Sequence, residues 1–164
     1  KDTLTSGLVG HWTFNGGTDM DWSSSTAEAR DVTGNGNHGD VQNFNYTSVT
    51  GGPLGQALIF DGEDDYVEAT VSQSKTSISV WYKSGGEWQH LIKSDGSYYI
   101  NGSSGSPATF PVYVSGDTVQ IGKDEGGSLV SGTIDDVRIY DRPLSESEIG
   151  KLYKIGSRKY KIRQ

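Results

Sequence analysis

The chain of 164 residues contains no cysteine, which excludes disulfide bonds, cysteine-ligated zinc and thiol nucleophiles. It also lacks any run near the roughly 20 apolar residues that a membrane-spanning helix needs, so we expect no membrane insertion of this segment. Hydrophobic residues make up only 32% of the chain, and prolines number four. By contrast, 23 glycines, nine tyrosines and four tryptophans are present, a composition typical of short aromatic-rich strands joined by many turns.

The chain also has no excess of positive charge. The formal net charge is −7 at pH 7, which argues against a nucleic-acid-binding or anionic-membrane-binding protein. The charge is uneven along the chain. Residues 151–164 contain six basic residues and no acidic one, which leaves 8 basic and 21 acidic residues among the first 150, a net charge of −13. We expect a domain over residues 1–156 followed by a basic C-terminal tail over residues 157–164.

Short segments with alternating apolar residues recur between turn formers along most of the chain, as in "DYVEATV", "SISVWYK" and "SGTIDDVRIYD". Their spacing predicts an all-β sandwich of antiparallel strands. The stretch "DMDWSSSTAEARDVTGNGNHG", residues 19–39, has no period and many turn formers, which predicts a long, ordered loop. It contains "GNGNHG", but no strand precedes these glycines and no helical pattern follows, so a nucleotide-binding loop is not expected.

One helix is expected near the C-terminus, in "RPLSESEIGKLYKIG". Ser145 and Glu148 have the spacing of a capping box, and Leu144 and Ile149 occupy the two positions of a hydrophobic staple. Gly156 is expected to close the helix.

Three acids in "FDGEDDYVEA", Glu63, Asp65 and Glu68, have the carboxylate spacing of laminarinase-type retaining glucanases. Retaining hydrolysis needs two carboxyl groups about 5 to 5.5 Å apart in a cleft. Glu63 follows an Asp-Gly pair and is expected to lie in a turn, whereas Glu68 lies in the strand that follows. We therefore expect no glucanase activity. The three histidines also lack the spacing of a metal site.

Three segments together resemble the laminin G-like domain of the concanavalin A-like lectin/glucanase superfamily, in its bacterial form. They are "LVGHWTFNGG" with "DVTGNGNHGD", then "GPLGQALIFDGEDDYVEA", and finally "SGTIDDVRIYDRPLSESEI". The resemblance implies a two-sheet antiparallel jelly-roll sandwich with one short C-terminal helix. In one region the chain departs from the family, because only two glycines join "SVWYKS" to "EWQHLI" where members carry further strands. This departure implies a smaller sandwich.

The resemblance also implies a structural calcium ion between an N-terminal loop and an acid on the closing strand. Asp135 in "GTIDDVRIY" shares a strand face with apolar residues, and a buried carboxylate needs a partner. A calcium ion would provide one, and the alternative is an ion pair with Arg30 or Arg138. The expected calcium ligands are Asn15, Gly16, Asp31 and Asp135.

Glycan binding is the recurrent activity of the family, and a sugar site needs an exposed aromatic face with a few polar groups. The candidate residues are Trp22, Tyr98, Tyr99 and Tyr113, whereas Trp12, Trp81 and Trp88 are expected in the core. We expect a non-catalytic recognition or adhesion module, extracellular or on the cell surface, that binds a glycan or a surface protein. It would be part of a larger multidomain or anchored protein. The alternative is a purely structural head domain of a pilus-like or surface-anchored protein.

Overall fold

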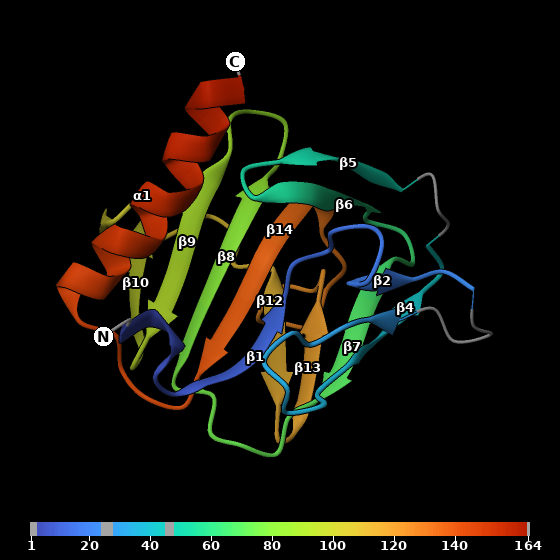
Figure 1. The fold of residues 1–164 in the computed structure, drawn as a ribbon, viewed down its shortest axis with the longest axis horizontal. Helices are drawn as coiled ribbons and strands as arrows, with labels where there is room; N and C mark the ends of the chain where they lie inside the picture. Colours follow the sequence, from blue (N-terminus) through green and yellow to red (C-terminus); the bar gives the residue numbers. More distant parts are fainter. Residues whose placement is uncertain (1–2, 24–27, 45–47, 164) are drawn as a thin grey trace.

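The computed structural model describes residues 3–23, 28–44 and 48–163, which form two antiparallel sheets packed face to face and a long helix (Figure 1). The larger sheet has the order β11 (Ser103–Ser104), β10 (Ser97–Ile100), β9 (Gln89–Ser94), β8 (Ser77–Lys83), β14 (Ser131–Tyr140), β6 (Gly55–Asp61) and β5 (Val49–Gly52), with β1 (Leu8–Trp12) also paired to β14. The smaller sheet has the order β12 (Val112–Ser115), β13 (Thr118–Ile121), β7 (Tyr66–Thr70), β4 (Gly39–Gln42), β3 (Glu28–Ala29) and β2 (Met20–Asp21). The predicted all-β sandwich is confirmed.

The longest strand, β14, organises the larger sheet because its two halves pair with different neighbours. Its first four residues pair with β6 and its last four with β1, while β8 pairs along the opposite side. The register with β8 shifts between Asp135 and Arg138, where Asp136 has a φ of 50°. Such a bulge redirects side chains. Asp136 accepts hydrogen bonds there from Arg138 at 2.9 Å and from the His11 ring at 2.6 Å.

The main core fills the space between the sheets, because alternate residues of each strand point toward the opposite sheet. Both sheets contribute to it with buried apolar residues, among them Trp12, Phe14, Leu58, Phe60, Val67, Val80, Leu91, Ile121, Ile134, Val137 and Ile139. Trp81 and Trp88 are also buried, as expected, but in a second cluster on the other side of the larger sheet. The larger sheet is therefore covered on both faces.

The helix α1 (Glu146–Arg163) lies across that second face and begins as predicted (Figure 1). The Ser145 N–H donates to the Glu148 carboxylate at 2.9 Å, and the Glu148 N–H donates to the Ser145 hydroxyl at 3.2 Å, which is the reciprocal pattern of a capping box. Leu144 and Ile149, the expected staple, are buried in one cluster. Arg142 donates to both carboxylate oxygens of Glu148 at 2.8 and 2.9 Å, and this lowers the pKa of Glu148 to about 2.

The end of the helix corrects two expectations. Gly156 does not close the helix, which continues to Arg163, so residues 157–163 are helical rather than a separate tail. The glycine instead allows close packing: a Cβ atom at Gly156 would lie 2.3 Å from the Trp81 ring. Within the described ranges, no helix is both long and apolar enough to cross a membrane.

The prediction of one long loop over residues 19–39 was wrong, because this segment contains the strands β2 and β3. Each has only two residues, too few for an alternating pattern to stand out. They extend the smaller sheet beyond β4, and they matter for the surface of that sheet described below.

Candidate functional site

The four aromatic residues expected to bind a ligand lie in different parts of the fold. Tyr99 packs against the apolar cluster beneath α1, and Trp22 packs in part against the main core. Tyr113 alternates with the inward-facing Val112 and Val114 on β12, so it points out from the smaller sheet beside Gly127. Tyr98 lines a hollow in the surface.

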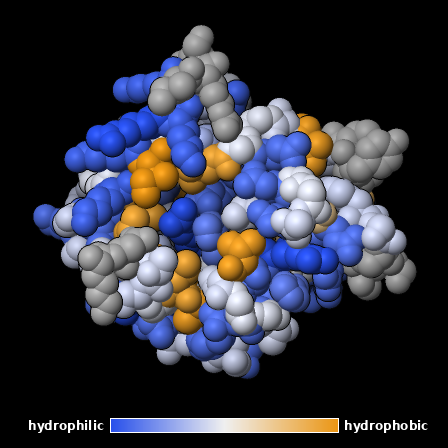
Figure 2. Space-filling view, viewed as in Figure 1, coloured by the Kyte–Doolittle hydropathy of each residue, from blue (hydrophilic) through white to orange (hydrophobic). Residues whose placement is uncertain are grey.

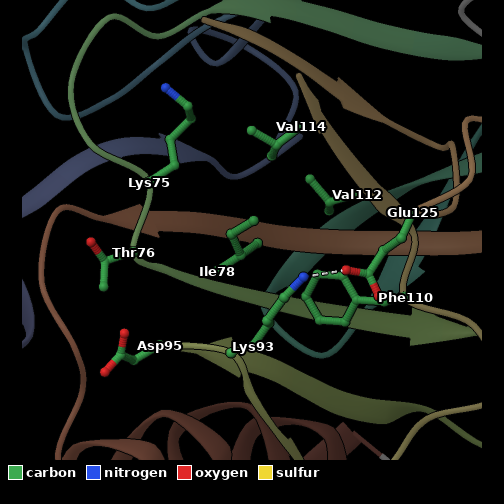
Figure 3. A pocket seen from close by; sticks show the side chains of 10 residues that line it. Lys75, Thr76, Ile78, Lys93, Asp95, Phe110, Val112, Val114 and Glu125 are labelled. Carbon is green, nitrogen blue, oxygen red and sulfur yellow. Dashed lines mark hydrogen bonds and ion pairs between the residues drawn. The ribbon is translucent and has the colours of Figure 1, made fainter. Parts of the chain in front are cut away.

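Next to this hollow lies an opening between the two sheets, which we call the edge cleft. Figure 3 shows Ile78 of β8 at its floor, with β12 on one side and β9 on the other. The cleft has a volume of about 540 Å³. Its apolar lining residues are Ile78, Phe110, Val112 and Val114, and its charged lining residues are Lys75, Lys93, Asp95 and Glu125. An apolar floor under a few polar groups is the usual composition of a small-ligand site.

Three side chains at the rim of the cleft form a hydrogen-bonded cluster. Glu125 accepts hydrogen bonds from the Lys93 ammonium and from the Tyr98 hydroxyl (Figure 3 shows the Lys93 contact). The Lys93 nitrogen also lies 5.3 Å from the centre of the Tyr98 ring. Because residues so far apart in sequence meet here, the arrangement was not visible from spacing alone.

The cluster shifts the pKa of each member. The hydrogen bond to Glu125 raises the pKa of Lys93, and burial together with Glu125 raises the pKa of Tyr98. Burial opposes ionisation of Glu125, yet the hydrogen bonds from Lys93 and Tyr98 prevail and lower its pKa. Glu125 is therefore held as a carboxylate that accepts two hydrogen bonds, which suits orientation of a polar ligand and not proton donation to one.

Beyond Glu125 the surface continues into a second hollow of about 340 Å³, lined by Tyr98, Phe110 and hydroxyl-bearing residues of the loop before β12, including Ser106 and Thr109. The Tyr98 and Phe110 rings contact each other edge to face, with centroids 5.9 Å apart. The two hollows thus share Phe110 and Glu125, and Tyr98 lines the second one. Aromatic rings beside a carboxylate are groups that a hydroxyl-rich ligand can stack on and hydrogen-bond to.

The acids with glucanase spacing serve structural roles. Glu63 is exposed in a turn, where its N–H donates to Asp61. Asp65 is buried and accepts a hydrogen bond from the Asp61 N–H at 3.0 Å, and its burial raises its pKa. Glu68 points out from the smaller sheet and accepts a hydrogen bond from Gln120 at 2.5 Å. One carboxylate oxygen each of Asp61, Asp64 and Asp65 lies within 4.8 Å of the others.

Asp31, one of the four expected calcium ligands, organises the turn that follows it. Its carboxylate accepts hydrogen bonds from the N–H groups of His11, Thr33 and Asn37 at 3.0 to 3.1 Å and from the Thr33 hydroxyl at 2.7 Å. A carboxylate surrounded by donors in this way is already satisfied without a cation.

The other three expected ligands lie around the turn between β5 and β6. The Asn15 side-chain oxygen accepts a hydrogen bond from the Gln56 N–H at 2.8 Å, and the Gly16 N–H donates to the Gln56 side chain. Asp135 is fully buried and accepts a hydrogen bond from the Leu54 N–H at 2.8 Å. The Asn15 and Asp135 oxygens thus accept hydrogen bonds from N–H groups in a different turn from that of Asp31.

The two arginines proposed as alternative partners of Asp135 have carboxylate partners of their own. Arg138 donates from Nε to Asp136 at 2.9 Å, and Arg30 lies 3.9 Å from Asp21. Asp136 and Arg138 are two positions apart on β14, on either side of the inward-facing Val137, so their side chains lie on the same face of the strand.

Comparison with solved structures gives domains of the same fold. Domain 4 of AbnA, an extracellular arabinanase from Geobacillus stearothermophilus solved with arabinotriose, superposes with a TM-score of 0.61 at 21% identity, covering 89% of this chain and 98% of that one. The binding domain of botulinum neurotoxin serotype D gives a TM-score of 0.60 at 11% identity, covering 93% of this chain and 53% of that one. A Trypanosoma rangeli sialidase gives 0.56 at 15% identity, covering 90% and 33%.

No curated protein sequence matches the chain. A family model described as the concanavalin A-like lectin/glucanases superfamily matches residues 18–150, which span most of the sandwich and the start of α1. The match agrees with the two antiparallel sheets, the long β14 and the capped helix that follows it. The chain therefore belongs to the concanavalin A-like lectin/glucanase superfamily.

Proposed function

We propose that this domain is a non-catalytic, extracellular or cell-surface recognition module that binds carbohydrate in the edge cleft. The observation that carries the proposal is the Lys93–Glu125–Tyr98 cluster, which joins an aromatic ring, a cation and a carboxylate at the mouth of two connected hollows. The arabinotriose bound to the similar arabinanase domain supports an oligosaccharide as the class of ligand.

Lack of catalysis is part of the proposal. Retaining and inverting hydrolysis both need a pair of carboxyl groups across the scissile bond, one of them protonated. The carboxylates that line the edge cleft are Asp95 and Glu125, and Glu125 is committed to Lys93 and Tyr98 with a lowered pKa. A cleft arranged in this way favours binding over proton transfer.

Calcium binding, which the family resemblance implies, stays a proposal of its own. The acidic body of the chain, with a net charge of −13 over residues 1–150, is compatible with it. Recognition does not depend on calcium in this proposal, because the cluster at the cleft is built from side chains that bind one another directly.

The test is a glycan array that includes arabino-oligosaccharides, probed with the folded chain in calcium buffer and again with a chelator. We expect specific binding that falls about tenfold or more in Tyr98→Ala, which removes the aromatic face. Glu125→Gln should weaken binding as well, since it removes the charge that holds Lys93 in place.

Tyr113→Ala is the matched control, because Tyr113 lies on the outer face of the smaller sheet and away from the cleft lining. Binding should survive in this variant. Binding that is lost in Tyr113→Ala and kept in Tyr98→Ala would refute the cleft as the site. A blank array from folded protein would refute carbohydrate recognition itself.

A further inference from the structure

The outward side of α1 has four cations in one line, Lys151, Lys154, Arg158 and Lys161, which we call the basic stripe. At 100° per residue these four positions lie within an arc of about 80°, opposite the side that packs on the larger sheet. All four are exposed. Figure 2 shows hydrophilic side chains gathered over the part of the surface where α1 lies in Figure 1.

The basic stripe has no paired acid among the residues that the structure describes. Within residues 3–23, 28–44 and 48–163, none of the four cations takes part in an ion pair. The acids of the helix, Glu146 and Glu148, lie in its first turn, and Glu148 is paired with Arg142. Cations placed together in this way repel one another and favour an anionic partner.

The opposite pattern occurs on the outer face of the smaller sheet. Strand register places four acids directly opposite one another on neighbouring strands: Asp21 pairs with Glu28, Glu28 with Asp40, and Asp40 with Glu68. Their neighbours Ala29, Val41 and Val67 point into the core, so the acids point outward. We call this set the acidic row (Asp21, Glu28, Asp40 and Glu68).

Like charges directly opposite on adjacent strands destabilise a sheet. Asp21 lies 3.9 Å from Arg30 and accepts hydrogen bonds from Ser23, and Glu68 accepts one from Gln120. In the described part of the chain, neither Glu28 nor Asp40 takes part in an ion pair. Asp40 is exposed and Glu28 is half-buried. A line of cations laid across the row would relieve this repulsion.

The two surfaces match in length and in number of charges. The basic stripe spans ten residues of helix, or about 15 Å at 1.5 Å per residue. The acidic row spans three steps between strands, or about 14 Å at about 4.8 Å per step. Four cations and four carboxylates thus share nearly the same spacing.

The two surfaces also lie on opposite sides of the molecule. Helix α1 covers the outer face of the larger sheet, whereas the acidic row is on the outer face of the smaller sheet (Figure 1). The stripe therefore cannot reach the row of its own chain. For the same reason, two copies cannot pair each stripe with the other copy's row at the same time.

We propose that the basic stripe of one copy binds the acidic row of a second copy, so that molecules associate head to tail. A contact between two different surfaces on opposite sides of a subunit repeats without closing unless rotation forms a ring. The product is a linear assembly of domains whose growth depends on charge. This association uses neither the edge cleft nor its three-residue cluster, so it stands apart from glycan binding.

Exposed ion pairs are individually weak, so association should be seen at high protein concentration and should depend on salt. The net charge of −7 repels copies at very low ionic strength, whereas the contact itself is screened at high ionic strength. Since the Debye length is about 10 Å near 0.1 M salt, moderate salt suppresses long-range repulsion and keeps the close contacts.

The test is sedimentation velocity on the full chain, at protein concentrations up to about 1 mM in about 50 mM and about 500 mM NaCl. Two charge-reversed variants are compared: Lys154→Glu/Arg158→Glu in the stripe and Asp40→Lys/Glu68→Lys in the row. Each alone should weaken association about tenfold or more, and an equimolar mixture of the two should restore it, because every reversed surface then meets a complementary one.

Lys83→Glu, compared with Arg158→Glu alone, is the control, because it makes the same change in net charge outside α1 and should leave association intact. If Asp40→Lys/Glu68→Lys does not fold, Glu28→Gln/Asp40→Asn removes charge from the row at nearly constant size. Monomers under all conditions, or a mixture that stays monomeric, would overturn the proposal. So would loss of association in the stripe variant alone, which would assign the stripe to another anionic surface.

Discussion

Replacing His90 with leucine should remove most of the acid sensitivity of this fold between pH 6.5 and pH 5. The imidazole is buried beneath α1, with ring centroids 4.8 Å from Trp81 and 6.3 Å from Tyr153. Its Nε2 atom contacts the Ser79 hydroxyl at 2.8 Å, and no described residue hydrogen-bonds to its Nδ1 atom. Burial disfavours the charged ring and lowers the pKa of His90 to about 3.

The sign and size of the effect follow from proton linkage. The unfolded chain takes up a proton at His90 as the pH falls through 6.5, whereas the folded chain does not do so until the pH nears 3. Stability is therefore lost as the pH falls, by up to about 1.4 kcal/mol per pH unit, or about 2 kcal/mol by pH 5. His90→Leu removes this term, at a cost of about 1 kcal/mol because the Ser79 hydroxyl loses its partner.

The assay is denaturant unfolding followed by tryptophan fluorescence at pH 7.5, 6.5, 5.5 and 5. Most carboxyl groups remain ionised above pH 5, so the window limits their contribution. Ile92→Val is the control, since it trims another buried side chain of the larger sheet without removing a titratable group, and it should keep the slope of the parent chain. An equal loss of stability in His90→Leu and in the parent chain would refute the linkage argument.

Three further predictions concern the helix and calcium. Gly156→Ala should lower the free energy of unfolding by about 1 kcal/mol or more in denaturant titrations, because the new Cβ would lie 2.3 Å from the Trp81 ring. Gly150 has open space around it, so Gly150→Ala should raise the free energy of unfolding by about 0.5 to 1 kcal/mol. The opposite result for either glycine would contradict the packing. Glu148→Gln should cost about 1 to 2 kcal/mol at pH 7, and because the pKa of Glu148 is lowered to about 2, the difference should shrink as the pH falls from 4.5 toward 2 in thermal melts. Chelation should lower the Tm in calorimetry if a structural calcium is bound, and an unchanged Tm would end that proposal.

The strands that the sequence predicted are those with enough residues to show alternation. β7, β8 and β14 each bury several of their apolar residues, and turn-forming residues flank each of them in the sequence. β2 and β3 were missed because a two-residue strand has no period. The start of α1 was predicted correctly because capping depends on residues three positions apart. The predicted end of α1 was wrong because Gly156 packs against a tryptophan 75 residues earlier, a contact that the sequence does not show.

The candidate site was harder to predict for the same reason. Tyr98 was singled out as an aromatic residue, but its partner Glu125 is 27 residues away, and only the fold brings them together. The acidic row depends on cross-strand register, which composition does not encode. The family resemblance implied Asp31 as a calcium ligand, but the sequence did not show the three N–H groups that donate to its carboxylate.

The central position of β14 has a consequence for how the chain folds during synthesis. This strand follows all the other strands in the sequence, yet its partners β1, β6 and β8 are all made before residue 84. Until β14 leaves the ribosome, β6 and β8 have open edges where it belongs, and β1 lacks its partner strand. Such long-range pairing makes folding slow and leaves edges exposed to other chains. We therefore expect the larger sheet to assemble only after β14 has been translated, and the open edges of β6 and β8 to need protection from other chains until then.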